Sequence, residues 1–273
     1  MKVLSNCHTH TQFCDAHNTM EEMVEAALVQ GFVSLGFTPH CRVNFGGLAG
    51  MTEEGEKAYL REFRRLRQKY AGRVRLYCGV EKDLYSATDC GEYTYRIGAV
   101  HLLPSAAGMT QVEGKPPVVE QMIREEFGGD TQAMARAYFR SLGAMALATR
   151  PEILGHFDVF MKRLRGRVDT EAAGYRKAAF DALEAILSAG CLLEVNTGGM
   201  VRAAQPCPYP ELWTLKRWRE MGGRVILGSD CHQAPMIAGY FEEAEDYVRA
   251  AGYTECWRLN PGEGLLFEPV QLG

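Results

Sequence analysis

Histidines and carboxylates recur at the ends of short strand-like runs in this chain. Four histidines, one glutamate and one aspartate come directly after apolar, β-branched or glycine-containing runs: His10, His40, Glu81, His101, His156 and Asp230. Imidazole is the commonest metal ligand near neutral pH, and carboxylates complete or bridge such sites. A scatter of structural and surface histidines would not repeat this placement. The pattern therefore predicts a metal site formed where several strands end.

Strand-like and helix-like segments alternate along the whole chain. Strands are predicted at 2–8, 33–40, 74–81, 95–101, 152–156, 191–196 and 224–230. Amphipathic helices are predicted at 19–30, 53–70, 130–149, 169–189, 210–221 and 238–251, and the first of them opens with the capping-box sequence Thr19-Met20-Glu21-Glu22. No internal repeat, low-complexity tract or long linker interrupts this order. We therefore expect a single domain over residues 1–273.

Seven β/α units in this order imply an α/β fold with a mostly parallel sheet. In a chain of 273 residues we expect the sheet to close into a seven-stranded, TIM-like barrel. The carboxyl ends of the strands form the active face of such barrels, and the candidate ligands lie at the ends of all the predicted strands except the sixth. An open doubly wound sheet is the alternative, but it offers ligands mainly at one switch point.

The composition of the chain limits the kinds of molecule that it is expected to bind. The formal net charge of −4 gives no basic footprint, so a nucleic-acid partner is not expected. No apolar stretch approaches the roughly 20 residues of a membrane span, and the first residues do not resemble a signal peptide. The nine cysteines include no C-x-x-C pair and form a poor disulfide framework. We expect a cytoplasmic protein with free thiols that acts on a small molecule.

Eight segments together resemble the polymerase and histidinol phosphatase (PHP) family, in particular its stand-alone histidinol-phosphate phosphatases. They are His8-Thr9-His10, FCDAHNTMEEMVEAA, LGFTPH, GVEKDLYS, YRIGAVHLL, EILGHFDVFMKR, LEVNTGGM and LGSDCH. They follow the family's order and spacing from residue 5 to about residue 232. The resemblance implies a distorted seven-stranded β/α barrel.

The resemblance also implies a site for three divalent transition-metal ions, zinc, iron or manganese. The implied ligands of the first metal are His8, His10, Glu81 and Asp230; Glu81 bridges to a second metal held by His101 and His156; His17, His40 and His232 hold the third. Two imidazoles separated by one residue point to the same face of a strand, which fits the pair His8 and His10. A hydroxide bridging the metals held by Glu81 and Asp230 would attack the phosphorus, with no protein nucleophile.

Cationic residues are candidates for binding the substrate phosphate. They are Lys162 and Arg163 after the fifth predicted strand, Arg202 after the sixth, and Arg42 in the loop after His40. Lys162 and Arg163 also belong to the run KRLRGR, which could equally be a solvated basic loop. A substrate that carries an ammonium group would need an acidic partner as well. Asp15, Asp83 and Asp158 are the candidates for that role.

Three functions fit these observations. The first is hydrolysis of the phosphomonoester of a small metabolite, L-histidinol phosphate, to L-histidinol and phosphate in histidine biosynthesis. The second is another phosphoesterase activity of the family, on nucleotides or nucleoside bisphosphates or as an exonuclease. An exonuclease should have a basic, aromatic-lined groove, and the acidic balance argues against it. The third is a non-catalytic metal-binding module, which missing ligands would indicate. All nine implied ligands are in place, so the first function is favoured.

Overall fold

One mostly parallel sheet forms the centre of the protein. The structure is a computed structural model that describes residues 2–43, 49–86, 88–106 and 108–273. The sheet order is β1-β2-β3-β4-β7-β8-β9-β10-β11, and a separate hairpin pairs β5 with β6. The strands are β1 (Ser5–Asn6), β2 (Ser34–Phe37), β3 (Arg75–Asp83), β4 (Tyr95–Ala99), β5 (Leu102–Ser105), β6 (Gly108–Gln111), β7 (Ile153–Leu154), β8 (Leu192–Asn196), β9 (Val225–Gly228), β10 (Glu255–Leu259) and β11 (Phe267–Gln271).

The seven strands expected from the sequence correspond to β1, β2, β3, β4, β7, β8 and β9, and each pairs in parallel with the next. The expected closed, seven-stranded barrel is not formed. Instead β10 pairs with the outer edge of β9 at Trp257 and Ile226, and antiparallel β11 covers β10. Because that edge of β9 pairs with β10, the described residues of β1 and β9 form no ladder with each other, and an isolated backbone bridge joins Thr9 and Cys231 beyond their ends. The α/β class and the parallel sheet are confirmed.

The sheet is nevertheless strongly curved. A small apolar cluster joins residues from strands at opposite ends of the sheet order: Cys7, Tyr77, Tyr95, Ile97, Ile153, Leu192, Ile226 and Leu259. Tyr95 on β4 donates a hydrogen bond to the carbonyl oxygen of Cys7 just beyond β1, at 2.5 Å. Ser34 on β2 likewise donates to the carbonyl oxygen of Leu259 on β10, at 2.6 Å. This curvature brings the carboxyl ends of the strands together.

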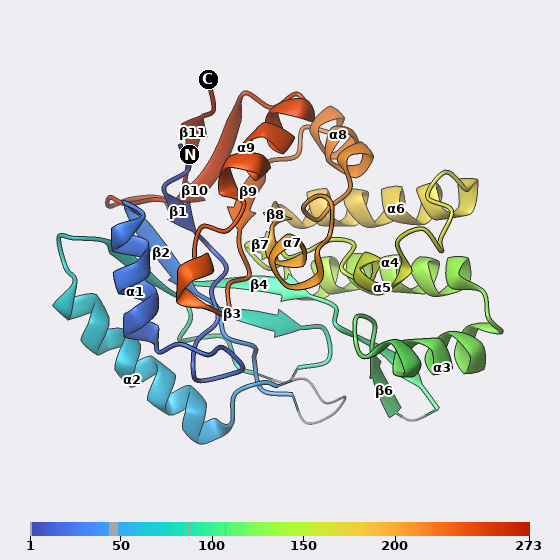
Figure 1. Cartoon of the computed structure of the whole chain (residues 1–273), viewed down its shortest axis with the longest axis horizontal. Helices are drawn as coiled ribbons and strands as arrows, with labels where there is room; N and C mark the ends of the chain where they lie inside the picture. Colours follow the sequence, from blue (N-terminus) through green and yellow to red (C-terminus); the bar gives the residue numbers. More distant parts are fainter. Residues whose placement is uncertain (1, 44–48, 87, 107) are drawn as a thin grey trace.

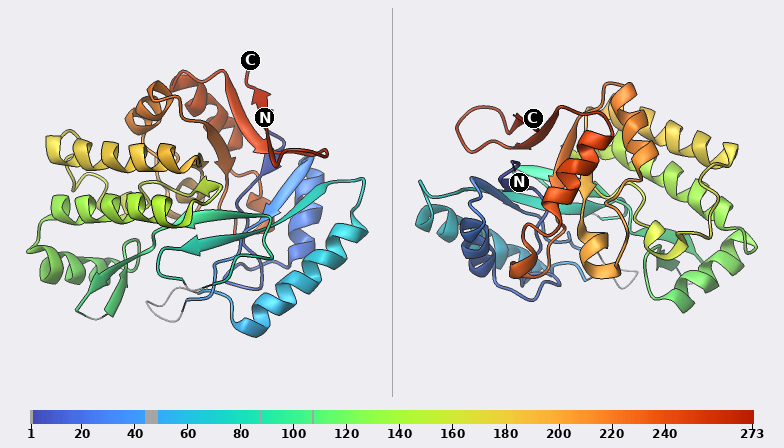
Figure 2. Two further views of the ribbon diagram at one scale, coloured as in Figure 1. Left: turned by 180° about the vertical axis from the view of Figure 1, so that it is seen from behind. Right: turned by 45° about the horizontal axis from the view of Figure 1, so that its top comes forward.

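Helices cover the outside of the sheet. They are α1 (Met20–Val29), α2 (Glu53–Lys69), α3 (Pro116–Phe127), α4 (Thr131–Thr149), α5 (Met161–Leu164), α6 (Ala173–Ala189), α7 (Gly198–Ala203), α8 (Leu212–Glu220), the 3-10 turn η1 (Ala234–Met236) and α9 (Phe241–Ala250). In Figure 1, α1 and α2 lie on one side, while α3, α4 and α6 lie on the other. Figure 2 shows α4 and α6 running side by side, and the two chain termini close together.

The helix boundaries follow local capping. Thr19 and Glu22 form the expected capping box at the start of α1, and the Asp130 side chain caps α4. The helix expected from residue 169 begins at Ala173, because Asp169 accepts a hydrogen bond from the backbone of Glu171 in a preceding turn. All nine cysteines are free thiols. In the part of the chain that the structure describes, no helix is both long and apolar enough to cross a membrane.

Candidate metal centre

Glu81 lies at the centre of the buried polar cluster. It is on β3 and 1% exposed. Its Oε1 atom is 2.8 Å from Nε2 of His156 and 3.2 Å from Nε2 of His101. Its Oε2 atom is 2.7 Å from Nδ1 of His40. One carboxylate therefore faces histidines that follow three different strands. Oε1 faces His156 and His101, and Oε2 faces His40.

A second group lies on the other side of Glu81. The Nε2 atoms of His8 and His10 are 3.3 Å apart. Oδ1 of Asp230 is 3.1 Å from Nε2 of His10 and 3.7 Å from Nε2 of His8. Oε2 of Glu81 is 3.5 Å and 3.6 Å from the same two nitrogens. These are the four residues expected around the first metal, and the structure brings them together.

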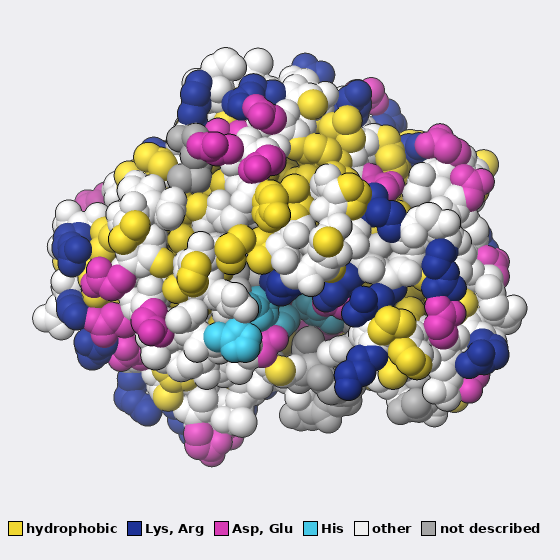
Figure 3. All heavy atoms as spheres, viewed as in Figure 1, with side chains coloured by type: hydrophobic (Ala, Val, Ile, Leu, Met, Phe, Trp, Pro, Cys, Tyr) yellow, Lys and Arg dark blue, Asp and Glu magenta, His cyan; other side chains and the backbone are white. Residues whose placement is uncertain are grey.

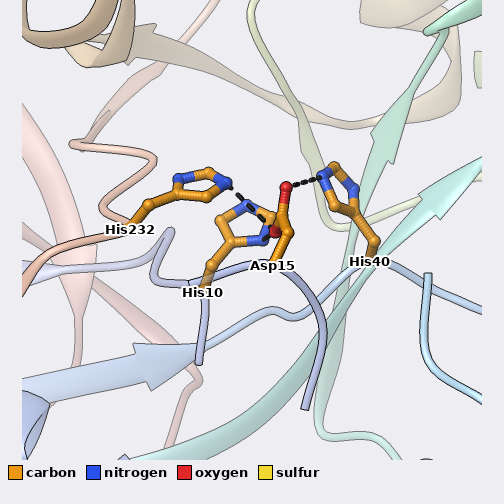
Figure 4. A group of neighbouring side chains, drawn as sticks. All are labelled: His10, Asp15, His40 and His232. Atoms are coloured by element: carbon orange, nitrogen blue, oxygen red, sulfur yellow. Dashed lines mark ion pairs between the residues drawn. The ribbon is translucent and has the colours of Figure 1, made fainter. Parts of the chain in front are cut away.

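A third group contains Asp15 instead of the expected His17. Figure 4 shows Asp15 surrounded by His10, His40 and His232. Its carboxylate oxygens are 3.2 Å from Nε2 of His232, 3.6 Å from Nδ1 of His10 and 3.8 Å from Nε2 of His40. Among the described residues, no group with metal-ligand spacing includes His17, which is exposed. The sequence had suggested Asp15 only as an ammonium acceptor.

The donor set fits divalent cations. Glu81 Oε2 and His40 Nδ1 are both buried and lie close together, yet neither makes a hydrogen bond. Nδ1 of His156 is also buried and has no hydrogen-bond partner among the described residues. Buried polar atoms without partners are costly, and several ring nitrogens and carboxylate oxygens that point at one another suit ions between them.

Electrostatics favour the ligand forms of Glu81, Asp230 and His10, whereas neighbouring carboxylates outweigh burial and raise the pKa of His8 and the pKa of His101. Burial opposes ionisation of Glu81, but the charges of His40, His101 and His8 outweigh it, so the pKa of Glu81 is held well below its usual value. Asp230 behaves in the same way beside Arg202 and His8, and its pKa is also lowered. Burial, then His232 and His40, lower the pKa of His10 to about 3. Ionised carboxylates and a neutral imidazole are what metal binding requires.

Glu194 on β8 is a functional candidate that sequence reasoning missed. It is fully buried, and its Oε1 atom lies 2.7 Å from Nδ1 of His8. Its Oε2 atom accepts hydrogen bonds of 2.9 Å from the backbone N–H of His156 and from Nδ2 of Asn196. Because a carboxylate only accepts, Glu194 holds a proton on Nδ1 of His8, so Nε2, which faces Glu81 and Asp230, is the ring nitrogen that a metal would bind. A lone glutamate within the apolar run CLLEVN was the available signal.

The four candidate phosphate-binding cations lie in different surroundings. Arg42 pairs with Glu56 at 3.0 Å and lines a surface hollow of about 430 Å³ with residues of α2; among the described residues, no hydrogen bond or ion pair links it to a histidine. Arg163 donates from Nε to the carbonyl oxygens of Glu113 and Gly114, at 3.1 and 2.7 Å. Its Nε atom therefore anchors a turn.

Arg202 and Lys162 remain as cations near the histidines. Nη2 of Arg202 is 2.5 Å from Oδ2 of Asp230, and Nη1 is 3.0 Å from Nδ1 of His232. Arg202, Asp230 and His232 line a cavity of about 280 Å³. Lys162 pairs with Glu113 at 2.7 Å. Figure 3 shows Lys and Arg side chains bordering the hollow in which histidines are visible.

Two of the candidate ammonium acceptors are occupied within the fold. The carboxylate of Asp83 accepts hydrogen bonds from the backbone N–H groups of His101 and Tyr85, at 2.9 and 3.0 Å. Asp158 accepts from the backbone N–H of Glu211 at 3.0 Å. Burial, followed by the charge of Glu211, raises the pKa of Asp158 to about 7. Both carboxylates are buried, and Oδ1 of Asp158 has no hydrogen-bond partner among the described residues.

Two proteins named as histidinol-phosphatases are similar in sequence to this chain over most of its length. A histidinol-phosphatase of Bacillus subtilis is 26% identical over 87% of this chain and 96% of its own length. A Deinococcus radiodurans protein assigned as a histidinol-phosphatase is 28% identical over 92% of this chain and 95% of its own.

Two solved structures share the fold. One is a Listeria monocytogenes protein assigned as a histidinol phosphatase (TM-score 0.75, 19% identity, 87% of this chain and 99% of the other). The other is a Lactococcus lactis histidinol phosphate phosphatase complexed with zinc, L-histidinol and phosphate (TM-score 0.67, 17% identity, 94% and 97%). Residues 6–198 match the PHP domain family, and the chain therefore belongs to that family.

Proposed function

We propose that this protein is a metal-dependent phosphomonoesterase that hydrolyses L-histidinol phosphate to L-histidinol and phosphate. The observation that carries the proposal is the buried cluster around Glu81, in which three groups of potential ligands share residues. The two curated relatives described above span nearly the whole chain and carry the name of this activity. The structurally similar Lactococcus lactis protein holds zinc, L-histidinol and phosphate.

We further propose that the cluster holds three divalent ions, zinc, iron or manganese. The proposed ligands are His8, His10, Glu81 and Asp230 for the first, Glu81, His101 and His156 for the second, and His40, His232 and Asp15 for the third. Asp15 replaces His17 in this assignment because of its distances to His10, His40 and His232. Such ions, when bound, neutralise phosphate charge and activate a water molecule.

The protein's own side chains have two tasks in this proposal. Arg202, which is one-third exposed and borders the 280 Å³ cavity, is the favoured residue for binding phosphate. Glu81 and Asp230 remain ionised, because neighbouring positive groups hold the pKa of each carboxyl well below its usual value. Cys14 lies 3.4 Å from His10, but burial raises the pKa of its thiol to about 12, so it is a poor nucleophile. Direct attack by water on phosphorus is therefore the proposed route.

The test is a phosphatase panel on protein whose metal content has been measured. We expect L-histidinol phosphate to be hydrolysed with a higher kcat/KM than nucleotides, nucleoside bisphosphates and sugar phosphates. Activity should be lost on chelation and return with added zinc or manganese. Faster hydrolysis of a nucleoside bisphosphate would favour the second activity considered from the sequence. Full activity after complete removal of metal would contradict the proposed mechanism.

A further inference from the structure

An ion pair between Glu113 and Lys162 lies beside the candidate metal centre. Lys162 is on α5, and Glu113 is in the turn between β6 and α3. Nζ of Lys162 is 2.7 Å from Oε2 of Glu113, and each side chain is only about one-fifth exposed. A pair this sheltered is screened less by solvent than a surface pair. The two charges of the pair can therefore interact strongly with charged groups of a ligand.

The backbone places Glu113 next to the metal-ligand candidates. The N–H of Val112, the residue before it, donates to the carbonyl oxygen of His101 at 2.9 Å. Arg163 holds the turn from the other side through the carbonyl oxygens of Glu113 and Gly114. Burial disfavours the charge on Glu113, but Lys162, His101 and His156 outweigh it and lower the pKa of Glu113. The carboxylate is thus ionised, fixed and within electrostatic reach of the site.

The carboxylate and the ammonium of this pair are complementary in charge to the ammonium and the phosphate of an aminoalkyl phosphate. In L-histidinol phosphate the carbon that carries the ammonium adjoins the carbon that carries the phosphate ester. A carboxylate and an ammonium side by side in the protein can pair with an ammonium and a phosphate side by side in a ligand. Of the acidic residues first considered for this role, Asp15 faces histidines and Asp83 accepts from backbone N–H groups, while Asp158 is buried and accepts from the backbone of Glu211 with one oxygen.

We infer that Glu113 binds the substrate ammonium while Lys162 binds the phosphate, so that this pair selects phosphomonoesters with an amine beside the ester carbon. The inference rests on the proposed function and assigns its substrate selectivity to residues. A charged hydrogen bond lost from a sheltered site typically lowers affinity or kcat/KM by roughly 10- to 100-fold. That loss should occur only with substrates that carry the amine.

The experiment compares L-histidinol phosphate with imidazolylpropyl phosphate, which lacks the ammonium, using metal-loaded wild type and Glu113→Gln. We expect Glu113→Gln to lower kcat/KM for L-histidinol phosphate by roughly 10- to 100-fold, and to leave the value for imidazolylpropyl phosphate within about threefold. Lys162→Met should weaken both substrates alike. Glu120→Gln, on the exposed surface of α3, is the matched control and should change neither.

Equal losses on both substrates in Glu113→Gln would mean that Glu113 only holds Lys162, and would overturn the inference while leaving the proposed function intact. A wild type that hydrolyses other phosphomonoesters but not L-histidinol phosphate would overturn the proposed function and this inference together. Metal content and melting temperature are measured for each variant. If Glu113→Gln is unfolded or loses metal, Glu113→Asp replaces it: a retained preference for the amine supports the inference, and a lost preference overturns it.

Discussion

Replacing Glu194 by glutamine should weaken metal binding although Glu194 does not face the metal cluster directly. The carboxylate accepts three hydrogen bonds: Oε1 from His8, and Oε2 from the backbone of His156 and from Asn196. A glutamine amide has one oxygen and one NH₂ group, so one of these two sides must lose its acceptor. Turning the NH₂ group toward His8 sacrifices one hydrogen bond instead of two, and we expect that orientation.

In that orientation His8 must accept at Nδ1, which moves its proton to Nε2. Nε2 is the atom that faces Glu81 and Asp230, and a protonated nitrogen cannot bind a metal. Loss of such a supporting carboxylate typically costs about 10- to 100-fold in metal affinity. The altered hydrogen bonding should also lower the free energy of unfolding of the metal-free protein by about 1–3 kcal/mol. Competition with a chromophoric chelator measures the first quantity, and urea unfolding the second.

Glu245→Gln is the matched control for this experiment. Glu245 on α9 is also buried and accepts hydrogen bonds from the backbone N–H groups of Lys2 and Val3. Its replacement should lower the free energy of unfolding without changing metal affinity. If Glu194→Gln bound metal as tightly as wild type, or if both variants lost metal equally, the orienting role of Glu194 would be refuted.

Three further changes test other parts of the site. Glu81→Gln should release at least two ions and lower kcat by more than about 100-fold, and elemental analysis showing full metal content would contradict the bridging assignment. Arg202→Ala should raise KM and lower kcat/KM by roughly 10- to 100-fold; because Arg202 contacts Asp230 and His232, some metal should also be lost. Asp158 has a folded pKa of about 7, above its unfolded value, so the stability it contributes is complete below the unfolded pKa and lost as pH rises toward 7. Asp158→Asn should therefore raise the free energy of unfolding by about 2–4 kcal/mol near pH 8, and by less near pH 5; equal effects at both pH values in urea unfolding would contradict the raised pKa.

The sequence predicted those parts of the fold that have strong local patterns. The strand that contains Glu81 and the strands that precede His40 and Asp230 were predicted, because apolar runs are visible in the sequence, although His40 and Asp230 lie shortly beyond the ends of β2 and β9. The hairpin of β5 and β6 was missed, since LLPS and GMTQ are short and one contains proline. The pairing of β10 with β9 was also missed. This pairing depends on which edge of β9 remains unpaired when the other strands have assembled, and the local sequence pattern does not predict that edge.

The third ligand group depends on a turn whose geometry the sequence does not reveal. His17 was expected to bind metal because the family resemblance implies a ligand there. In the structure, the backbone N–H groups of Cys14 and Ala16 both donate to the carbonyl oxygen of Thr11. This tight turn directs Asp15 toward His10 and His232 and leaves His17 exposed. The direction of a side chain in an irregular loop depends on such hydrogen bonds, which residue types alone do not fix.

The strand without a ligand at its end has a different role in the site. Glu194 on β8 lies behind His8 and His156, and its neighbours on the flanking strands leave room for it. A Cβ atom on Gly228 would lie 1.9 Å from Oε1 of Glu194, and one on Gly155 would lie 3.4 Å from Oε2. Glycine at position 228 therefore makes room for a buried carboxylate that reaches His8, which follows β1, and His156, which follows β7. The curvature of the sheet is also needed for these contacts. It brings β1 and β7 close enough for one side chain on β8 to contact both His8 and His156.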